Sequence, residues 1–179
     1  MNRVEIPLSK AKVVLMLVGA LIFVIAGVFF IIDPEMFLRP PYHKVVMVRT
    51  VGVAAVLFFG AAAFFVIRKM GDKRPGLIVD EQGIYDNTSG TSIGLIRWED
   101  ITEIETKDIS STKVLLIHVS NPDAYLDKVS GFKRKAMQMN YNMYGTPLSI
   151  TANTLKYKFN ALEQLLQEGL SSKANNGRG

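Results

Sequence analysis

The sequence predicts an α+β protein in which an N-terminal pair of transmembrane helices precedes a small β-rich domain closed by one helix. Two uncharged apolar runs, residues 13–32 and 51–67, lie close together near the start of the 179-residue chain. Short runs of strand composition, separated by turn residues, then occupy residues 76–157. An apolar stripe of helical spacing follows them, which predicts one amphipathic C-terminal helix.

Each apolar run is long enough to cross a bilayer as a helix. The first holds 20 residues, and at about 1.5 Å per residue it spans roughly 30 Å, the thickness of the hydrocarbon layer. The second holds 17 residues and reaches this length if residues 45–50 continue the helix, with the Arg49 guanidinium extending to the headgroups. We therefore expect spans at about residues 13–32 and 48–67, within a hairpin of residues 1–75.

Two other interpretations of the apolar runs fit the sequence less well. A cleaved signal peptide has a shorter apolar core, and the Asp-Pro-Glu of residues 33–35 offers no cleavage pattern of small residues. A buried hairpin of a soluble protein normally keeps a polar face, whereas these runs are apolar around the whole helix. Small residues within the runs favour close packing of the two helices. These are Gly19, Gly27, Gly52, Ala55 and Ala62.

The positions of Lys and Arg predict the orientation of the hairpin. Three precede the first span, three lie between the spans, and four follow the second span within seven residues. The outer flanks therefore carry the excess. By the positive-inside rule, both termini and the domain after residue 75 lie on the cytoplasmic side.

The net charge of +5 belongs to the hairpin rather than to the domain. Residues 1–76 carry ten basic and four acidic side chains, whereas residues 77–179 carry eleven basic and twelve acidic ones. The basic flanks suit contact with anionic lipid headgroups, and the nearly neutral domain makes nucleic acid an unexpected partner. The absence of cysteine excludes disulfides, thiol nucleophiles and thiolate metal sites.

The domain, residues 76–172, is large enough for one hydrophobic core. Its strands are expected at residues 77–79, 84–85, 92–97, 101–107, 113–119, 147–151 and 154–157. Asn160 and Glu163 predict the N-cap and capping box of the last helix. Its apolar stripe faces the sheet and consists of Leu162, Leu165, Leu166 and Leu170. The polar tail, residues 173–179, is expected to be disordered.

Seven short strands closed by a C-terminal helix are typical of a pleckstrin-homology-like (PH-like) β-barrel. The segments GLIVD (76–80), GI (83–84) and WEDI (98–101) resemble bacterial PH-like domains, in which a "dGi" turn follows the first strand and "W-x-D-I" leads into a middle strand. With EIPLSK (5–10) and MNYNMYGTP (139–147), the chain is similar to an uncharacterised family of small two-pass bacterial inner-membrane proteins. The resemblance implies a cytosolic PH-like domain and a multi-pass topology, but no activity.

The first hairpin turn of this chain differs from that of phosphoinositide-binding PH domains. Those domains place lysines and arginines around the first hairpin turn, whereas this turn carries Asp80 and Glu81. Two carboxylates would repel a phosphorylated headgroup, so specific inositide binding is not expected.

A helix inserted at residues 123–144 is the most suggestive feature of the domain. Its apolar stripe consists of Tyr125, Val129, Phe132, Ala136, Met139 and Met143. Basic side chains accompany it, namely Lys128, Lys133, Arg134 and Lys135. Such a helix suits a bilayer surface. The alternative is that the stripe packs on the barrel or on the last helix. A methionine-rich face that binds a protein is a third interpretation. The candidate surface comprises Tyr125, Lys128, Phe132, Lys133, Arg134, Lys135, Met139 and Met143.

No pattern in the sequence indicates catalysis. There is no phosphate loop, nucleophile elbow or His-Glu-x-x-His motif, and His43 and His118 are too far apart in the chain to indicate a metal site. The spans carry no central charge for an ion pathway, and Trp98 is expected in the core. We therefore expect no catalytic, cofactor-binding or metal-binding residues.

These features together predict a non-enzymatic, membrane-anchored binding or scaffolding module. Its partner would be a membrane or cytosolic protein that the sequence does not identify, and the chain could also form a homo-oligomer. The alternative is an immunity protein whose spans intercept a membrane-acting toxin.

Overall fold

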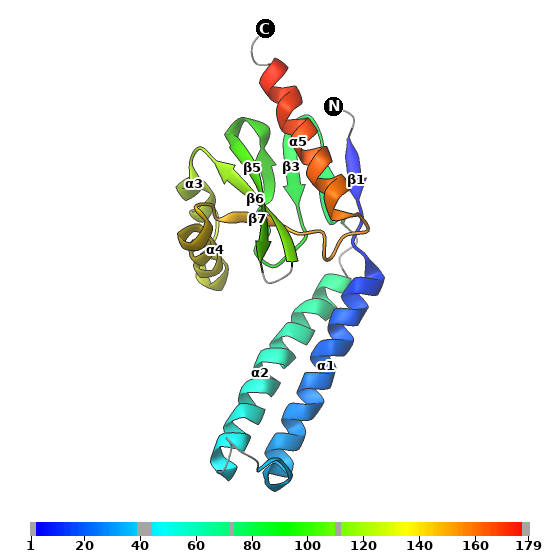
Figure 1. Ribbon diagram of the computed structural model, residues 1–179, viewed down its shortest axis with the longest axis vertical. Coiled ribbons are helices and arrows are strands. Elements are labelled where there is room, and N and C mark those ends of the chain that lie inside the picture. Colours follow the sequence, from blue (N-terminus) through cyan, green and yellow to red (C-terminus); the bar gives the residue numbers. More distant parts are fainter. Residues whose placement is uncertain (1–2, 39–43, 72–73, 110–111, 177–179) are drawn as a thin grey trace. The chain divides into compact units, whose positions relative to one another are not determined.

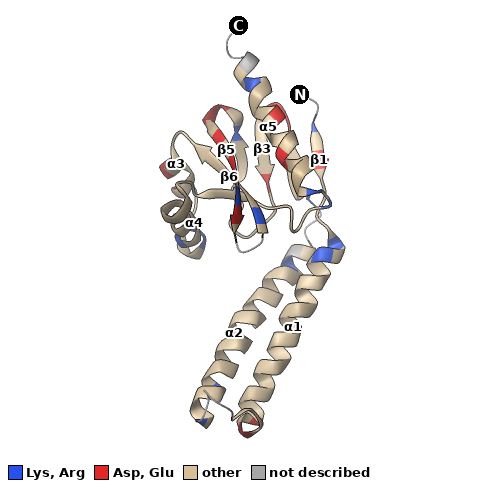
Figure 2. Ribbon diagram, viewed as in Figure 1, with Lys and Arg blue, Asp and Glu red and all other residues tan. Residues whose placement is uncertain are grey.

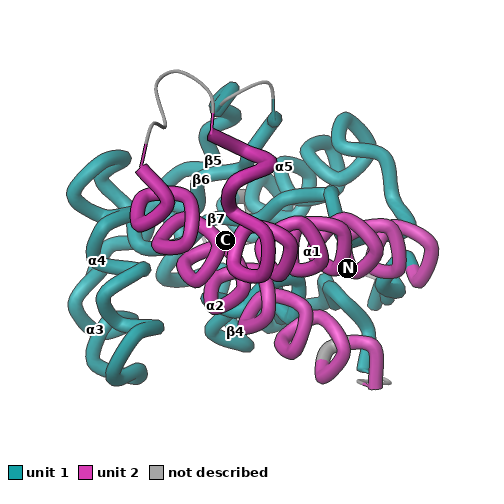
Figure 3. Tube along the Cα trace, turned by 90° about the horizontal axis from the view of Figure 1, so that it is seen from below, with its two compact units in different colours: residues 1–9, 74–179 teal, residues 10–73 magenta. Residues whose placement is uncertain are grey.

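The computed structural model describes residues 3–38, 44–71, 74–109 and 112–176 (Figure 1). The chain divides into two compact units, which Figure 3 colours separately. One is a helical hairpin, residues 10–73, and the other is an α+β domain formed by residues 1–9 and 74–179. Residues 1–9 thus group with the domain, although the sequence pattern places them with the hairpin.

The hairpin consists of two long antiparallel helices, α1 (Lys10–Ile32) and α2 (Val45–Met70), with the short 3-10 helix η1 (Pro34–Phe37) after α1. Both long helices are long and apolar enough to cross a membrane, and only 11% of each apolar window is buried. Figure 2 shows charged residues near the helix ends and uncharged lengths between them. The two predicted spans are therefore present as helices, each longer than expected.

Two glycines allow the helices to approach closely. A Cβ added to Gly52 would lie 2.7 Å from the carbonyl oxygen of Gly27, and one added to Gly27 would lie 3.0 Å from that of Gly52. Elsewhere along the hairpin, the rings of Phe23 and Phe59 stack with their centroids 4.4 Å apart. Small side chains and stacked rings thus hold together helices whose remaining surface is mostly apolar.

The strands of the domain form two antiparallel sheets. The first has the order β1-β2-β3-β4, from β1 (Val4–Ile6), β2 (Leu77–Val79), β3 (Gly83–Asp86) and β4 (Gly94–Arg97). The second has the order β5-β6-β7, from β5 (Ile101–Ile109), β6 (Thr112–Val119) and β7 (Leu148–Ile150). Six of these strands overlap the predicted ones.

The remaining strand, β1, precedes the hairpin in the chain. It pairs antiparallel with β2, so that Val4 lies opposite Val79 and Ile6 lies opposite Leu77. The predicted strand at residues 154–157 is wrong, because only Leu155 forms a bridge there, with Leu8. The backbone of this segment instead turns on itself, since the Leu155 N–H donates to the carbonyl of Ala152.

The core of the domain lies between the strands and helix α5 (Phe159–Asn176). Leu162 and Leu166 are fully buried in it, as the leucine stripe predicts. The predicted N-cap is wrong, because α5 already begins at Phe159 and includes Asn160. The Glu163 carboxylate instead accepts a hydrogen bond from the Thr106 hydroxyl of β5. At its other end, α5 continues to Asn176, within the tail that was expected to be disordered.

Trp98 joins two turns of the domain. It lies in the 3-10 helix η2 (Trp98–Asp100), and its side chain is 3% exposed. Its indole N–H donates to the carbonyl oxygen of Asp80 at 2.8 Å, and its backbone N–H donates to that of Gln82. The expectation of a core tryptophan is therefore confirmed.

Candidate functional site

The predicted helix at residues 123–144 is broken into α3 (Pro122–Leu126) and α4 (Gly131–Tyr144). Asn121 caps the start of α3, where its side-chain oxygen accepts a hydrogen bond from the Ala124 N–H at 3.2 Å. Gly131 has a φ of +60°, a left-handed conformation that glycine adopts without steric cost. The break shifts the helical phase, so the apolar stripe expected from the sequence does not continue along one face.

Helix α3 is fixed in the core by Tyr125. This side chain is 2% exposed, and its hydroxyl donates to the Asp100 carboxylate at 2.6 Å. Burial, together with this hydrogen bond, raises the pKa of Tyr125 to about 12. Tyr125 therefore belongs to the packed interior, and its place in the candidate surface is wrong.

Helix α4 exposes the other apolar residues of that surface. Phe132, Met139 and Met143 are 87%, 63% and 61% exposed, and we call these three the exposed apolar face. At about 100° per residue they fall within roughly 40° of arc, centred about 140° from Met137. Met137 marks the buried side and is 1% exposed. Phe132, Met139 and Met143 therefore do not pack on the domain, and the predicted stripe is not buried as a whole.

Four basic side chains lie on α4 or just before it, and Figure 2 shows the blue positions on α4. At about 100° per residue, Lys135 lies roughly 60° from the centre of the exposed apolar face, whereas Arg134 lies roughly 160° from it. The Lys128 ammonium lies 4.2 Å from the centroid of the Tyr125 ring. The Lys133 ammonium donates to the Ser92 carbonyl at 2.5 Å, and Arg134 pairs with Asp127 at 3.0 Å. Lys135 forms no ion pair or hydrogen bond with the residues that the structure describes. The contacts of the other three fix the helix and leave its charge only partly neutralised.

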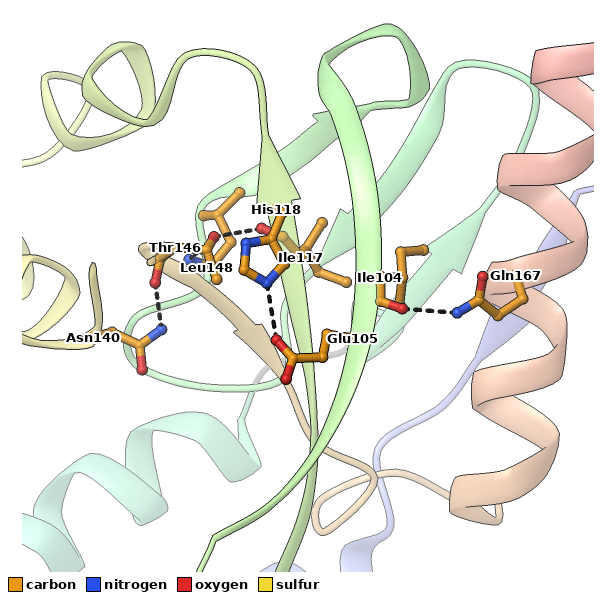
Figure 4. A network of polar contacts seen from close by, with 8 residues as sticks. All are labelled: Ile104, Glu105, Ile117, His118, Asn140, Thr146, Leu148 and Gln167. Atoms are coloured by element: carbon orange, nitrogen blue, oxygen red, sulfur yellow. Dashed lines mark hydrogen bonds and ion pairs between the residues drawn. The ribbon is translucent and has the colours of Figure 1, made fainter. Parts of the chain in front are cut away.

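The C-terminal end of α4 is bound to strand β6, as Figure 4 shows. The Asn140 amide donates to the Thr146 carbonyl at 3.0 Å, and the Thr146 hydroxyl donates to the carbonyl of Ile117. Next to them, His118 of β6 contacts Glu105 of β5 at 3.2 Å. The contacts of Asn140 and Thr146 thus link the C-terminal end of α4 to β6.

Among the residues that the structure describes, the other candidate groups do not gather into a metal site. Within the described ranges, no three His, Asp or Glu side chains lie close enough together to hold a metal ion. His43 lies outside the described residues. A groove of about 430 Å³ runs along α2, but its lining is apolar apart from Thr50 and Arg49. The exposed apolar face is therefore the candidate site.

The sequence pattern missed the partners that orient this face. Asp127 and Ser92 hold the basic residues of α4, although each lies in a segment with ordinary turn composition. Their role depends on how the chain folds and not on local spacing. Comparisons with protein-family models, curated proteins and solved structures found no match to this chain.

Proposed function

We propose that this protein is a non-enzymatic binding or scaffolding module anchored in the bacterial inner membrane, with a PH-like domain in the cytoplasm. The main observation behind the proposal is the exposed apolar face on a domain attached to two apolar helices. Large apolar surfaces rimmed by polar residues mark sites of interaction. The domain would thus be held at the membrane by the hairpin and would bind through α4.

The exposed apolar side chains of the hairpin support its proposed role as a membrane anchor. Leu15, Phe58 and Phe64 are 71%, 70% and 67% exposed. A water-soluble protein would bury side chains of this size, because each contributes about 1.5–3 kcal/mol when it leaves water. A bilayer provides the same gain without a protein partner.

The pairing of β1 with β2 supports a hairpin that returns to its starting side. These two strands flank α1 and α2 in the chain, and they share three register pairs. Strands that pair with each other must lie on one side of a membrane, so the chain between them crosses an even number of times. The basic residues at the outer flanks favour the cytoplasm as that side.

The contacts of Trp98 support a PH-like barrel. They join the turn after β2 to the segment before β5, which are the two segments that resemble bacterial PH-like domains. Helix α5 covers the core at the end of the chain, as the capping helix of such a barrel would. Seven strands and one C-terminal helix are consistent with this fold.

Two measurements in living cells test the proposal. A photoreactive amino acid at position 132 or 139 should form crosslinks to the binding partner. One at Ser171, an exposed position on α5, should not. A reporter active only outside the cytoplasm should be inactive after Gly179 and active near Pro40. The absence of crosslinks at both α4 positions would contradict the binding role, and activity after Gly179 would contradict the orientation.

A further inference from the structure

The shape of the exposed apolar face favours a flat partner. Phe132 and Met143 are eleven residues apart, so the face is a line of about 16 Å along one helix. The break before Gly131 and the contacts of Asn140 hold this line outward. A single line of protruding side chains fits the boundary between headgroups and acyl chains, where amphipathic helices lie in the plane of the bilayer.

The charge of α4 favours an anionic partner. The helix contains Lys133, Arg134 and Lys135 and no acidic residue, and Lys128 precedes it. Asp127 neutralises Arg134 only in part, because this ion pair is solvent-exposed and its two side chains are 50% and 67% accessible. Lys135, roughly 60° from the centre of the exposed apolar face, would meet anionic headgroups while the face enters the layer beneath them.

The covalent connection to the hairpin keeps a lipid surface within reach of the domain. Three residues separate β1 from α1, and six separate α2 from β2. Tethers this short give the bilayer a high effective concentration around the domain, so even a weak contact would be occupied. A cytosolic protein partner lacks this advantage.

We infer that Phe132, Met139 and Met143 insert into the headgroup layer of the anionic bilayer that holds the hairpin, with Lys135 at the phosphate level. The inference rests on the proposed function, since it names the partner of the same α4 face. It makes the lipid surface itself, rather than a protein, the ligand of the domain.

The lack of cysteine allows a direct test in the full-length protein. Single cysteines at 132, 139, 143 and 171 would each carry a spin label, with the protein reconstituted in vesicles of phosphatidylglycerol and phosphatidylethanolamine. Labels at 132, 139 and 143 should be more accessible to oxygen than to a water-soluble nickel chelate. The label at 171 should show the opposite order. In vesicles of phosphatidylcholine alone, or with Lys135→Glu, the oxygen preference at 139 should fall.

The outcomes distinguish a failure of lipid insertion from a failure of the proposed function. Lipid insertion would be overturned if, in anionic vesicles, the labels at 132, 139 and 143 were as accessible to oxygen and to the nickel chelate as the label at 171. If crosslinks to a protein still formed at 132 in cells, the binding module would stand with a protein ligand. If neither lipid insertion nor crosslinks were observed, both proposals would fall.

Discussion

The hairpin and the α+β domain place the same residue types in opposite positions. Leu15 and Phe58 of the hairpin are 71% and 70% exposed, whereas Leu115 and Leu166 of the domain are fully buried. The domain follows the rule for proteins in water, whereas the hairpin has the exposed apolar surface expected of helices that cross a membrane. Within the domain, Phe132 is 87% exposed and thus resembles the hairpin.

Polar groups show the same contrast. The domain buries Asp86 and Thr146, and both form hydrogen bonds. Where the structure describes the chain, no buried side-chain nitrogen or oxygen lacks a partner. The hairpin instead satisfies its backbone within each helix and needs few polar side chains. The solvent around each region decides which residues stabilise it, so substitutions of one type should have different effects in the two regions.

The largest expected difference is between two leucines. Leu166→Ala should lower the free energy of unfolding of the domain by about 2–5 kcal/mol, because it removes a fully buried side chain. Leu57→Ala on α2, where the side chain is 69% exposed, should leave that transition unchanged. Fluorescence of Trp98, the single tryptophan, reports unfolding of the domain in the full chain in detergent. Equal losses for the two variants would contradict the contrast.

A pH titration tests the buried tyrosine of the domain. The raised pKa of Tyr125, about 12 against an ordinary 10.0, means that only the unfolded chain releases this proton between these values. The free energy of unfolding of the domain should therefore fall as pH rises from 10 to 12. Tyr125 should contribute about 1.4 kcal/mol per pH unit to this slope. Tyr125→Phe should lose this part of the slope. An unchanged slope in the variant, measured against the wild type by Trp98 fluorescence, would contradict the assignment.

A glycine substitution tests the packing of the hairpin. Gly52→Leu should separate α1 from α2 at a cost of about 1–3 kcal/mol, because its Cβ would meet the rigid backbone of Gly27. Gly60→Leu is the matched control, since a Cβ there would meet nothing within 4 Å. Cysteines replacing Phe23 and Phe59 would report the separation through their rate of crosslinking. A slower rate in Gly60→Leu than in Gly52→Leu would refute this packing.

These contrasts also explain which features the sequence could predict. The hairpin follows from composition, because a helix in lipid satisfies its own backbone and needs only length and apolarity. The leucine stripe of α5 follows from spacing alone. Strand β1 was missed because three residues become a strand only through a partner more than seventy positions away.

The candidate surface was predicted only in part for the same reason. The sequence selected Phe132, Met139 and Met143, which are exposed, but it placed them on one stripe with the buried Tyr125. A capped first turn and a left-handed glycine change the helical phase between these residues. Periodicity assumes one continuous helix, so it assigns both groups to one face. The burial of Tyr125 and the exposure of Phe132 depend on that local break.

The smallest expected effect concerns the stability of the exposed apolar face. Phe132→Asp should change the free energy of unfolding of the domain by no more than about 0.5 kcal/mol, because the side chain is 87% exposed. Met137→Asp, on the buried side of the same helix, should destabilise the domain strongly, since it would bury an unpaired carboxylate. Thermal melts of both variants in detergent, followed by Trp98 fluorescence, would compare them.

The pair of variants separates a binding residue from a core residue on one helix. If Phe132→Asp melts like the wild type and also loses the crosslinks of a photoreactive amino acid at position 139 in cells, Phe132 acts at the surface and not in folding. A melting temperature as low as that of Met137→Asp would instead mean that Phe132 packs inside the domain. The exposed apolar face would then be an ordinary part of the core, and the contrast between water-facing and lipid-facing residues would not extend to α4.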